Sequence, residues 1–82
     1  MHMEMAHQGI FTGRGHIIAL VPGKRQIVVG HEEIKGFMAA MPMGMGYPVE
    51  SAELLKGLHP GDQVIFKIDA AKKKIIAIEK MP

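Results

Sequence analysis

The sequence predicts an all-β protein: a compact barrel of five short strands, with one short helical turn between the third and fourth strands. Five segments rich in isoleucine and valine follow one another, and turns containing proline or glycine separate several of them. The chain has 82 residues, 48% of them hydrophobic, which is enough for one domain with one small core.

The expected strands cover residues 10–21, 26–31, 37–49, 63–68 and 74–79. Gly13 and Gly15 in the first half of the first strand indicate a bulge or a sharp bend, as in a small barrel. Pro22 and Gly23 form the turn that follows, because proline presets φ and glycine accepts positive φ.

Residues 51–57 are expected to form the short helical turn. Ser51 is a suitable N-cap, and Glu53 suits the positive end of the helix dipole. Gly57 suits the C-terminal stop, because glycine readily adopts the left-handed conformation there.

His31 ends the second strand on the same face as Ile27 and Val29, which are core-type residues. Glu32 or Glu33 could orient its second ring nitrogen, although a solvated pair of loop residues is the simpler interpretation. The sequence therefore indicates a histidine that is fixed at the end of a core strand.

Methionine is concentrated in one stretch, since four of the eight methionines lie between Met38 and Met45. Met41, Met43 and Met45 alternate with a proline and a glycine. Residues at i, i+2 and i+4 line one face of a strand. The spacing therefore predicts a row of three thioethers on one side of the third strand.

A row of thioethers near a histidine is a ligand set for a soft metal ion. One histidine and two methionines would give a three-coordinate site suited to Cu(I) or Ag(I), whereas hard ions require oxygen ligands. The alternative is that the methionines only fill a core. The interrupting proline and glycines, and the scarcity of leucine and valine there, favour a site, but both interpretations remain open.

Composition excludes several classes of function. The absence of cysteine excludes disulfides, thiolate chemistry and cysteine-based zinc sites. The net charge of +2 does not suggest the basic surface that duplex binding needs. No apolar run approaches the roughly 20 residues of a transmembrane helix. No acid–base or nucleophile constellation is evident, so we do not expect an enzyme.

Residues 1–8 are expected to form a flexible tail, and residues 9–82 a single metal-binding domain. The tail offers a weak accessory metal site through His2, Met3, Met5 and His7. No hydrophobic signal segment is visible, so an exported protein would have lost its signal, or the chain would be a domain of a longer one. His16 is expected to be half-buried, and His59, in a turn, to be solvated.

Two other functions remain open from the residues alone. A nucleic-acid-binding module could use Lys24, Arg25, Lys72, Lys73 and Lys74 to contact phosphate. Such modules present aromatic stacking platforms, and the chain has only three phenylalanines and one tyrosine. The second alternative is a methionine-rich protein-docking domain that holds no metal.

Four segments in combination resemble the CusF-like copper- and silver-binding domain. They are residues 15–21 (GHIIALV), 26–31 (QIVVGH), 43–49 (MGMGYPV) and 61–66 (GDQVIF). The resemblance spans about residues 13–80. A strand-terminal histidine followed by Met-x-Met, an aromatic residue and a valine is a fairly specific combination, whereas Met-x-Met alone is not.

The resemblance implies a five-stranded OB-like barrel that binds Cu(I) or Ag(I) in the periplasm. It implies that His31, Met43 and Met45 are the metal ligands, with Tyr47 and Val49 anchoring the match. Proteins of this kind are free metallochaperones or C-terminal domains of the adaptor subunit of heavy-metal efflux pumps. The expected partners are therefore efflux components rather than nucleic acid, and the isolated domain is expected to be monomeric and not inserted in a membrane.

The chain departs from the family in lacking tryptophan, which in many members caps the metal by a cation–π contact. Phe37 could take that capping role, and Met38 or Met41 could supply an additional ligand. Counting forward from the strand-terminal histidine would favour Met41 and Met43 as the ligand pair instead of Met43 and Met45.

Overall fold

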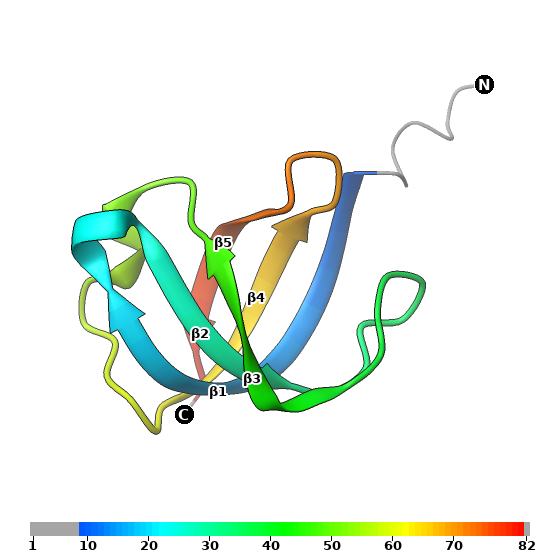
Figure 1. Ribbon diagram of the computed structural model, residues 1–82, viewed down its shortest axis with the longest axis horizontal. Helices are drawn as coiled ribbons and strands as arrows, with labels where there is room; N and C mark the ends of the chain where they lie inside the picture. The colour runs from blue at the N-terminus through cyan, green and yellow to red at the C-terminus, as the bar shows by residue number, and fades with distance from the viewer. Residues whose placement is uncertain (1–8, 82) are drawn as a thin grey trace.

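A computed structural model describes residues 9–81, and within them five strands form one antiparallel sheet (Figure 1). The strands are β1 (Ile10–Val21), β2 (Gln26–His31), β3 (Met41–Pro48), β4 (Gln63–Asp69) and β5 (Lys74–Lys80). Two short 3-10 turns are η1 (Pro22–Lys24) and η2 (Ala52–Leu55). The order across the sheet is β3-β2-β1-β4-β5. The prediction of an all-β fold with five strands is confirmed.

The long strand β1 pairs with a different strand along each half of its length. Its residues 10–16 pair with β4, and its residues 15–21 pair with β2. Figure 1 shows β1 curving as it passes from one partner to the other. The two edge strands then approach each other, because Val49, just after β3, forms a parallel bridge with Ile75 of β5. The sheet is therefore curled until its edges meet at this bridge.

The bend of β1 depends on a close approach at Gly15, which pairs with His31. A Cβ atom on Gly15 would collide with the carbonyl oxygen of Gly30 and lie 2.8 Å from the His31 Cα atom. A Cβ atom on Gly13 would lie 2.6 Å from an aromatic ring of the core. The predicted bend is confirmed, and the bulge itself lies at Ile18, where the register with β2 shifts.

One apolar core fills the concave side of the sheet. The expected inner face of the second strand is confirmed, since Ile27, Val29 and His31 are buried, and alternate residues of β4 are buried as well. The largest fully buried side chains are Phe66, Ile17, Ile27, Ile34, Ile68, Ile75, Val29 and Val64. Burying such side chains contributes about 1.5–3 kcal/mol each, so this cluster supplies most of the stabilisation.

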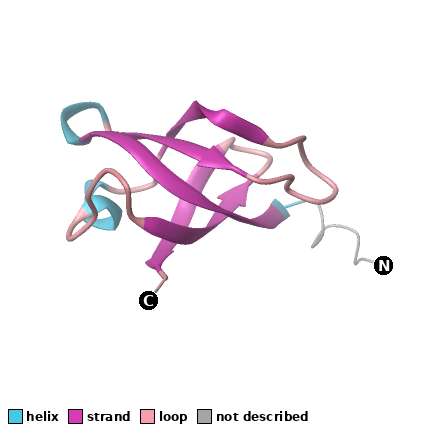
Figure 2. Cartoon of the chain, turned by 90° about the horizontal axis from the view of Figure 1, so that it is seen from below, coloured by secondary structure: helices cyan, strands magenta, loops and turns pink. Residues whose placement is uncertain are grey.

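The two 3-10 turns lie at one end of the sheet, and the loop of residues 32–40 lies at the other (Figures 1 and 2). The predicted helical turn is confirmed as η2. The Ser51 Oγ atom accepts a hydrogen bond from the Glu53 backbone N–H at 3.1 Å, as expected of an N-cap. Gly57 has φ of +77°, which suits a chain reversal.

The third strand begins later than predicted, at Met41. Residues 34–38 first turn back on themselves, because the Ile34 N–H donates to the Met38 carbonyl at 2.8 Å and the reverse bond measures 3.0 Å. Gly36 supplies the positive φ of +81° within this turn. Ile34 is buried, so the turn is pinned to the core. The expected strand start at residue 37 is therefore wrong.

The other two histidines of the described region lie at the surface. The expectation that His16 is half-buried is wrong, because β1 turns Ile17 inward and leaves His16 exposed on the outer face. The expectation for His59 is confirmed, since its side chain is 73% exposed.

The predicted tail of residues 1–8, with its accessory ligands, lies outside the described residues. Within the part of the chain that the structure covers, no helix has the length and hydropathy needed to cross a membrane.

Replacing Gly15 with alanine is expected to destabilise the fold by about 3 kcal/mol, because the added methyl group overpacks a backbone contact. Gly46→Ala is the matched control, since a Cβ atom there meets nothing within 4 Å. Denaturant unfolding of both variants measures the difference. Equal unfolding midpoints would show that the bend tolerates a side chain at Gly15.

Asp62 gives the fold an acid-sensitive turn before β4. Its carboxylate accepts the His59 backbone N–H at 2.9 Å and lies 3.4 Å from the Lys80 ammonium. The His59 N–H, and then Lys80, hold the pKa of Asp62 below its usual value. Because the folded pKa is the lower one, this stabilisation is complete above the unfolded pKa and is lost as the pH falls through the folded pKa.

We therefore expect Asp62→Asn to lose part of the acid dependence of the free energy of unfolding that the native chain shows. Thermal unfolding of both chains, from neutral to strongly acidic pH, measures it. Parallel curves for the two chains would contradict this role of Asp62.

Candidate metal site

The imidazole of His31, a candidate nitrogen ligand, is held in a fixed position at the end of β2. Its side chain is buried, with a relative exposure of 3%. Its Nδ1 atom lies 2.8 Å from the backbone carbonyl oxygen of Glu32. A carbonyl only accepts, so Nδ1 carries the hydrogen and the neutral ring has its lone pair on Nε2. The orienting partner is thus the backbone of Glu32, while the Glu32 and Glu33 side chains are exposed.

Tyr47 lies opposite this lone pair. It is buried on β3, and its hydroxyl oxygen is 2.9 Å from the His31 Nε2 atom. The same hydroxyl donates to the Met38 Sδ atom at 2.8 Å. Burial raises the pKa of Tyr47, so the hydroxyl keeps its hydrogen at neutral pH. One hydroxyl therefore contacts both a nitrogen and a sulfur of the predicted ligand types.

Met38 reaches this position because of the turn in the 32–40 loop. The bridge between Ile34 and Met38 fixes its backbone, and the side chain packs against the core. The sequence predicted Met38 only as an additional ligand, because nothing in the residue pattern shows that this turn folds over the end of the sheet.

Met45 lies on the same side of the molecule as Met38. It pairs with Val29 in the sheet and is half-buried against the core. Met38, Met45, Tyr47 and Phe37 contribute to one apolar pocket of about 370 Å³. Two methionine side chains therefore line the same pocket as Tyr47.

The predicted row of three thioethers is interrupted by a bulge. Pro42, Met43 and Gly44 together stand opposite Gly30, and Gly44 has φ of +109°. Met43 is consequently 90% exposed, while Met41 is half-buried beside His31 in the ladder. The strict alternation that the spacing implies fails here because two extra residues change the direction of the side chains.

Phe37, the predicted cap, is stacked on Phe11 with ring centroids 5.2 Å apart and an interplanar angle of 19°. It also lines the pocket that contains Met38 and Met45. The ring therefore forms an apolar wall of this pocket.

The aromatic side chains pack against one another or in the core. Tyr47 and Phe66 are buried, and the Phe66 ring meets the His31 ring edge-on at 6.0 Å. Phe11 and Phe37 stack on each other. The stacking platform that a single-strand-binding module requires is not formed by the residues that the structure describes.

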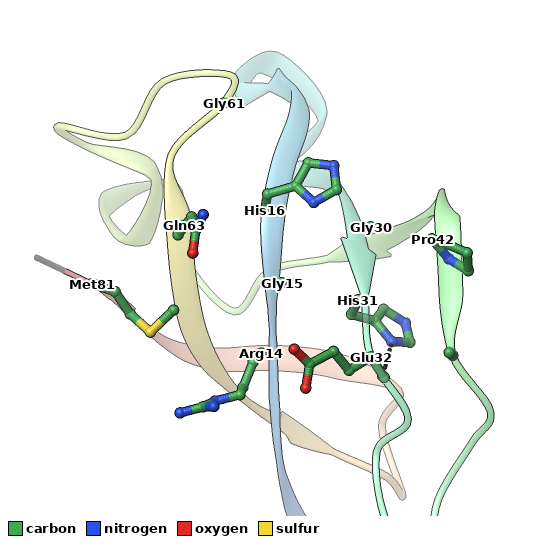
Figure 3. Close-up of a pocket in the computed structure, with 11 residues that line it drawn as sticks. Arg14, Gly15, His16, Gly30, His31, Glu32, Pro42, Gly61, Gln63 and Met81 are labelled. Atoms are coloured by element: carbon green, nitrogen blue, oxygen red, sulfur yellow. Dashed lines mark hydrogen bonds between the residues drawn. The ribbon is translucent and has the colours of Figure 1, made fainter.

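His31 borders a separate pocket of about 580 Å³, which His16, Glu32 and Pro42 also line (Figure 3). Figure 3 shows His16 and His31 on neighbouring strands, both on the side that faces Pro42. The Nδ1 atom of His31 contacts the Glu32 carbonyl, whereas the Nε2 atom is directed to Tyr47. The Met38 and Met45 side chains line the smaller pocket.

From the sequence, Tyr47 is predicted only as a residue that anchors the family resemblance. The sequence does contain a signal that Tyr47 makes a polar contact, because the hydroxyl of a buried tyrosine in an apolar strand needs a hydrogen-bond partner. That the partners are His31 and Met38 follows only from the folded positions of β2 and the 32–40 loop.

The His31 imidazole nitrogen and the Met38 thioether both contact the Tyr47 hydroxyl, and the Met45 thioether lines the apolar pocket with Met38 and Tyr47. These are soft donors, which suit Cu(I) or Ag(I). A comparison with protein families finds one match over residues 11–81, described as "Copper binding periplasmic protein CusF". Searches of curated proteins and of solved structures return no match. The matching family binds Cu(I) or Ag(I) without enzymatic activity, and its match covers nearly the whole chain. The chain therefore belongs to the CusF family of copper-binding periplasmic proteins.

Proposed function

We propose that this chain captures Cu(I) or Ag(I) through His31 and nearby thioethers, and then transfers the ion to components of a heavy-metal efflux pump. The observation that carries the proposal is the convergence of the His31 Nε2 and Met38 Sδ atoms on one hydroxyl. Membership of the CusF family supports the identity of the metal and the association with efflux.

The fixed imidazole supports capture of a monovalent ion. The bond between Nδ1 and the Glu32 carbonyl fixes the orientation of the ring and leaves Nε2 as the nitrogen available to a metal. A buried side chain loses little conformational freedom on binding, so less of the interaction energy is lost to ordering.

The predicted thioether ligands have different accessibilities, which suggests different roles. We assign Met38 and Met45, on the walls of the apolar pocket, to the bound ion together with His31. Met43, exposed at the bulge, remains a proposed ligand that meets the ion first and passes it to a partner. Met41 is half-buried beside His31, and it is the alternative ligand if Met38 and Met45 do not bind the ion.

The neutral character of these ligands supports transfer rather than storage. A thioether is a soft ligand that needs no deprotonation, and without thiolates the site can exchange its ion. Met43 lies on β3, an edge of the sheet, where methionines of an efflux component can approach the ion. We propose such a component as the acceptor.

The binding proposal predicts a saturable Ag(I) site at one equivalent in the full chain. His31→Ala should weaken Ag(I) binding by at least about 100-fold. Removing only the hydrogen-bond partner of a metal ligand already lowers metal affinity by about 10–100-fold, and this variant removes a ligand itself. Met38→Leu and Met45→Leu should weaken binding with little change in stability, because leucine replaces methionine at nearly constant volume. NMR signals of the methionine methyl groups and the histidine rings report each residue separately.

Met81→Leu is the matched control and should bind as the unaltered chain does. If the ring signal of His31 fails to shift while signals of residues 1–8 saturate, the site lies in the tail and the proposal is wrong. Binding unaffected by Met38→Leu and Met45→Leu would return the assignment to Met41 and Met43.

The transfer proposal predicts a separate effect of Met43. Met43→Leu should slow the passage of Ag(I) to a methionine-rich acceptor peptide by on the order of ten-fold, and lower affinity by less, because exchange needs an accessible donor. Stopped-flow mixing measures the rate, with Met41→Leu as the comparison. Equal transfer rates for both variants and the native chain would exclude this role.

A further inference from the structure

The Tyr47 hydroxyl occupies an unusual position between two of the proposed ligands. It lies 2.9 Å from the His31 Nε2 atom and 2.8 Å from the Met38 Sδ atom. Both distances are within direct contact, so the oxygen fills the point on which the two donor atoms converge. A metal ion bound to both donors would need the same position.

The hydrogen bonds of this cluster suit a site without a metal. The Nδ1 hydrogen of His31 is given to the Glu32 carbonyl, so Nε2 of the neutral ring needs a donor. The hydroxyl has one hydrogen, which is directed to the Met38 sulfur, and the His31 Nε2 atom lies within reach of the same hydrogen. Without a metal the hydroxyl can therefore donate to either acceptor, and it gives the buried nitrogen a partner that would be costly to lose.

The phenol oxygen is a poor ligand for the ion itself. Cu(I) and Ag(I) prefer sulfur and imidazole, whereas a neutral hydroxyl oxygen is a hard donor. Its contacts with Nε2 and Sδ are consequently made to the empty site and are lost when the soft donors bind a metal.

We propose that the Tyr47 hydroxyl is a placeholder, which holds the His31 and Met38 donors together in the empty site and is displaced by the incoming ion. This inference rests on the proposed function and adds a residue that sets affinity without being a ligand. The site keeps its geometry when empty, and binding must break the contacts of the hydroxyl. Tyr47 therefore lowers affinity and makes release of the ion easier.

The chain allows a direct test, because Tyr47 is its single tyrosine and it has no tryptophan. Labelling tyrosine with ¹³C gives one Cζ signal, which is sensitive to hydrogen bonding of the hydroxyl. Ag(I) titration of the full chain should shift this signal in parallel with the His31 ring signals. Loss of the hydroxyl proton signal and of its cross-peaks to the His31 ring should accompany the shift.

Tyr47→Phe removes only the hydroxyl and should bind Ag(I) about five-fold more tightly, the effect of losing one net hydrogen bond from the empty state. Phe11→Leu, at a ring that stacks on Phe37, is the control for general loosening and should not tighten binding. The native-chain NMR readout needs no variant, so it decides the question even if Tyr47→Phe folds poorly.

The outcomes separate this inference from the proposed function. If the native chain binds Ag(I) through His31 while the Tyr47 hydroxyl keeps its cross-peaks to the ring, the placeholder is excluded and the metal site stands. Weaker binding by Tyr47→Phe would likewise overturn it, since the hydroxyl would then support the bound ion. If the native chain binds no Ag(I) through His31, the proposed function fails and the placeholder with it.

Discussion

The pairing of Gly15 with His31 is the constraint on which the rest of the structure depends. At this point β1 leaves β4 and joins β2, so the backbones must approach more closely than any side chain on Gly15 would allow. The bend curls the sheet and turns the end of β2 inward. A polar ring is thereby buried beside Phe66 at the rim of the core, where it can be fixed by neighbours and still reach sulfur.

Much of the fold follows from patterns that the residues carry locally. Alternating apolar residues defined β2 and β4, Ser51 defined the start of η2, and the paired glycines of β1 indicated the bend. These features depend on steric preferences within a few residues, so they can be predicted without knowing the partner strands. The outward position of His16 could not, because its face depends on where the rest of the sheet lies.

The candidate site was predicted less completely, because its contacts are made between segments distant in sequence. His31 was predicted as a candidate ligand because a histidine at the end of an apolar strand can be recognised from the sequence alone. Met38 is brought to the candidate site by the turn at Gly36. This turn forms in place of a longer β3 because burial of Ile34 stabilises it. The row of methionines was predicted from ideal period-two geometry, which does not anticipate the bulge around Met43.

The bulge in β3 also bears on how the protein stays soluble. A flat edge strand is a template for pairing with another chain, and pairing there would bury the exposed Met43 side chain. Pro42 has no N–H to offer, and the positive φ of Gly44 twists the edge out of plane. The irregularity that exposes Met43 thus also discourages strand-to-strand association, so a sheet edge can stay open to small ions while resisting aggregation.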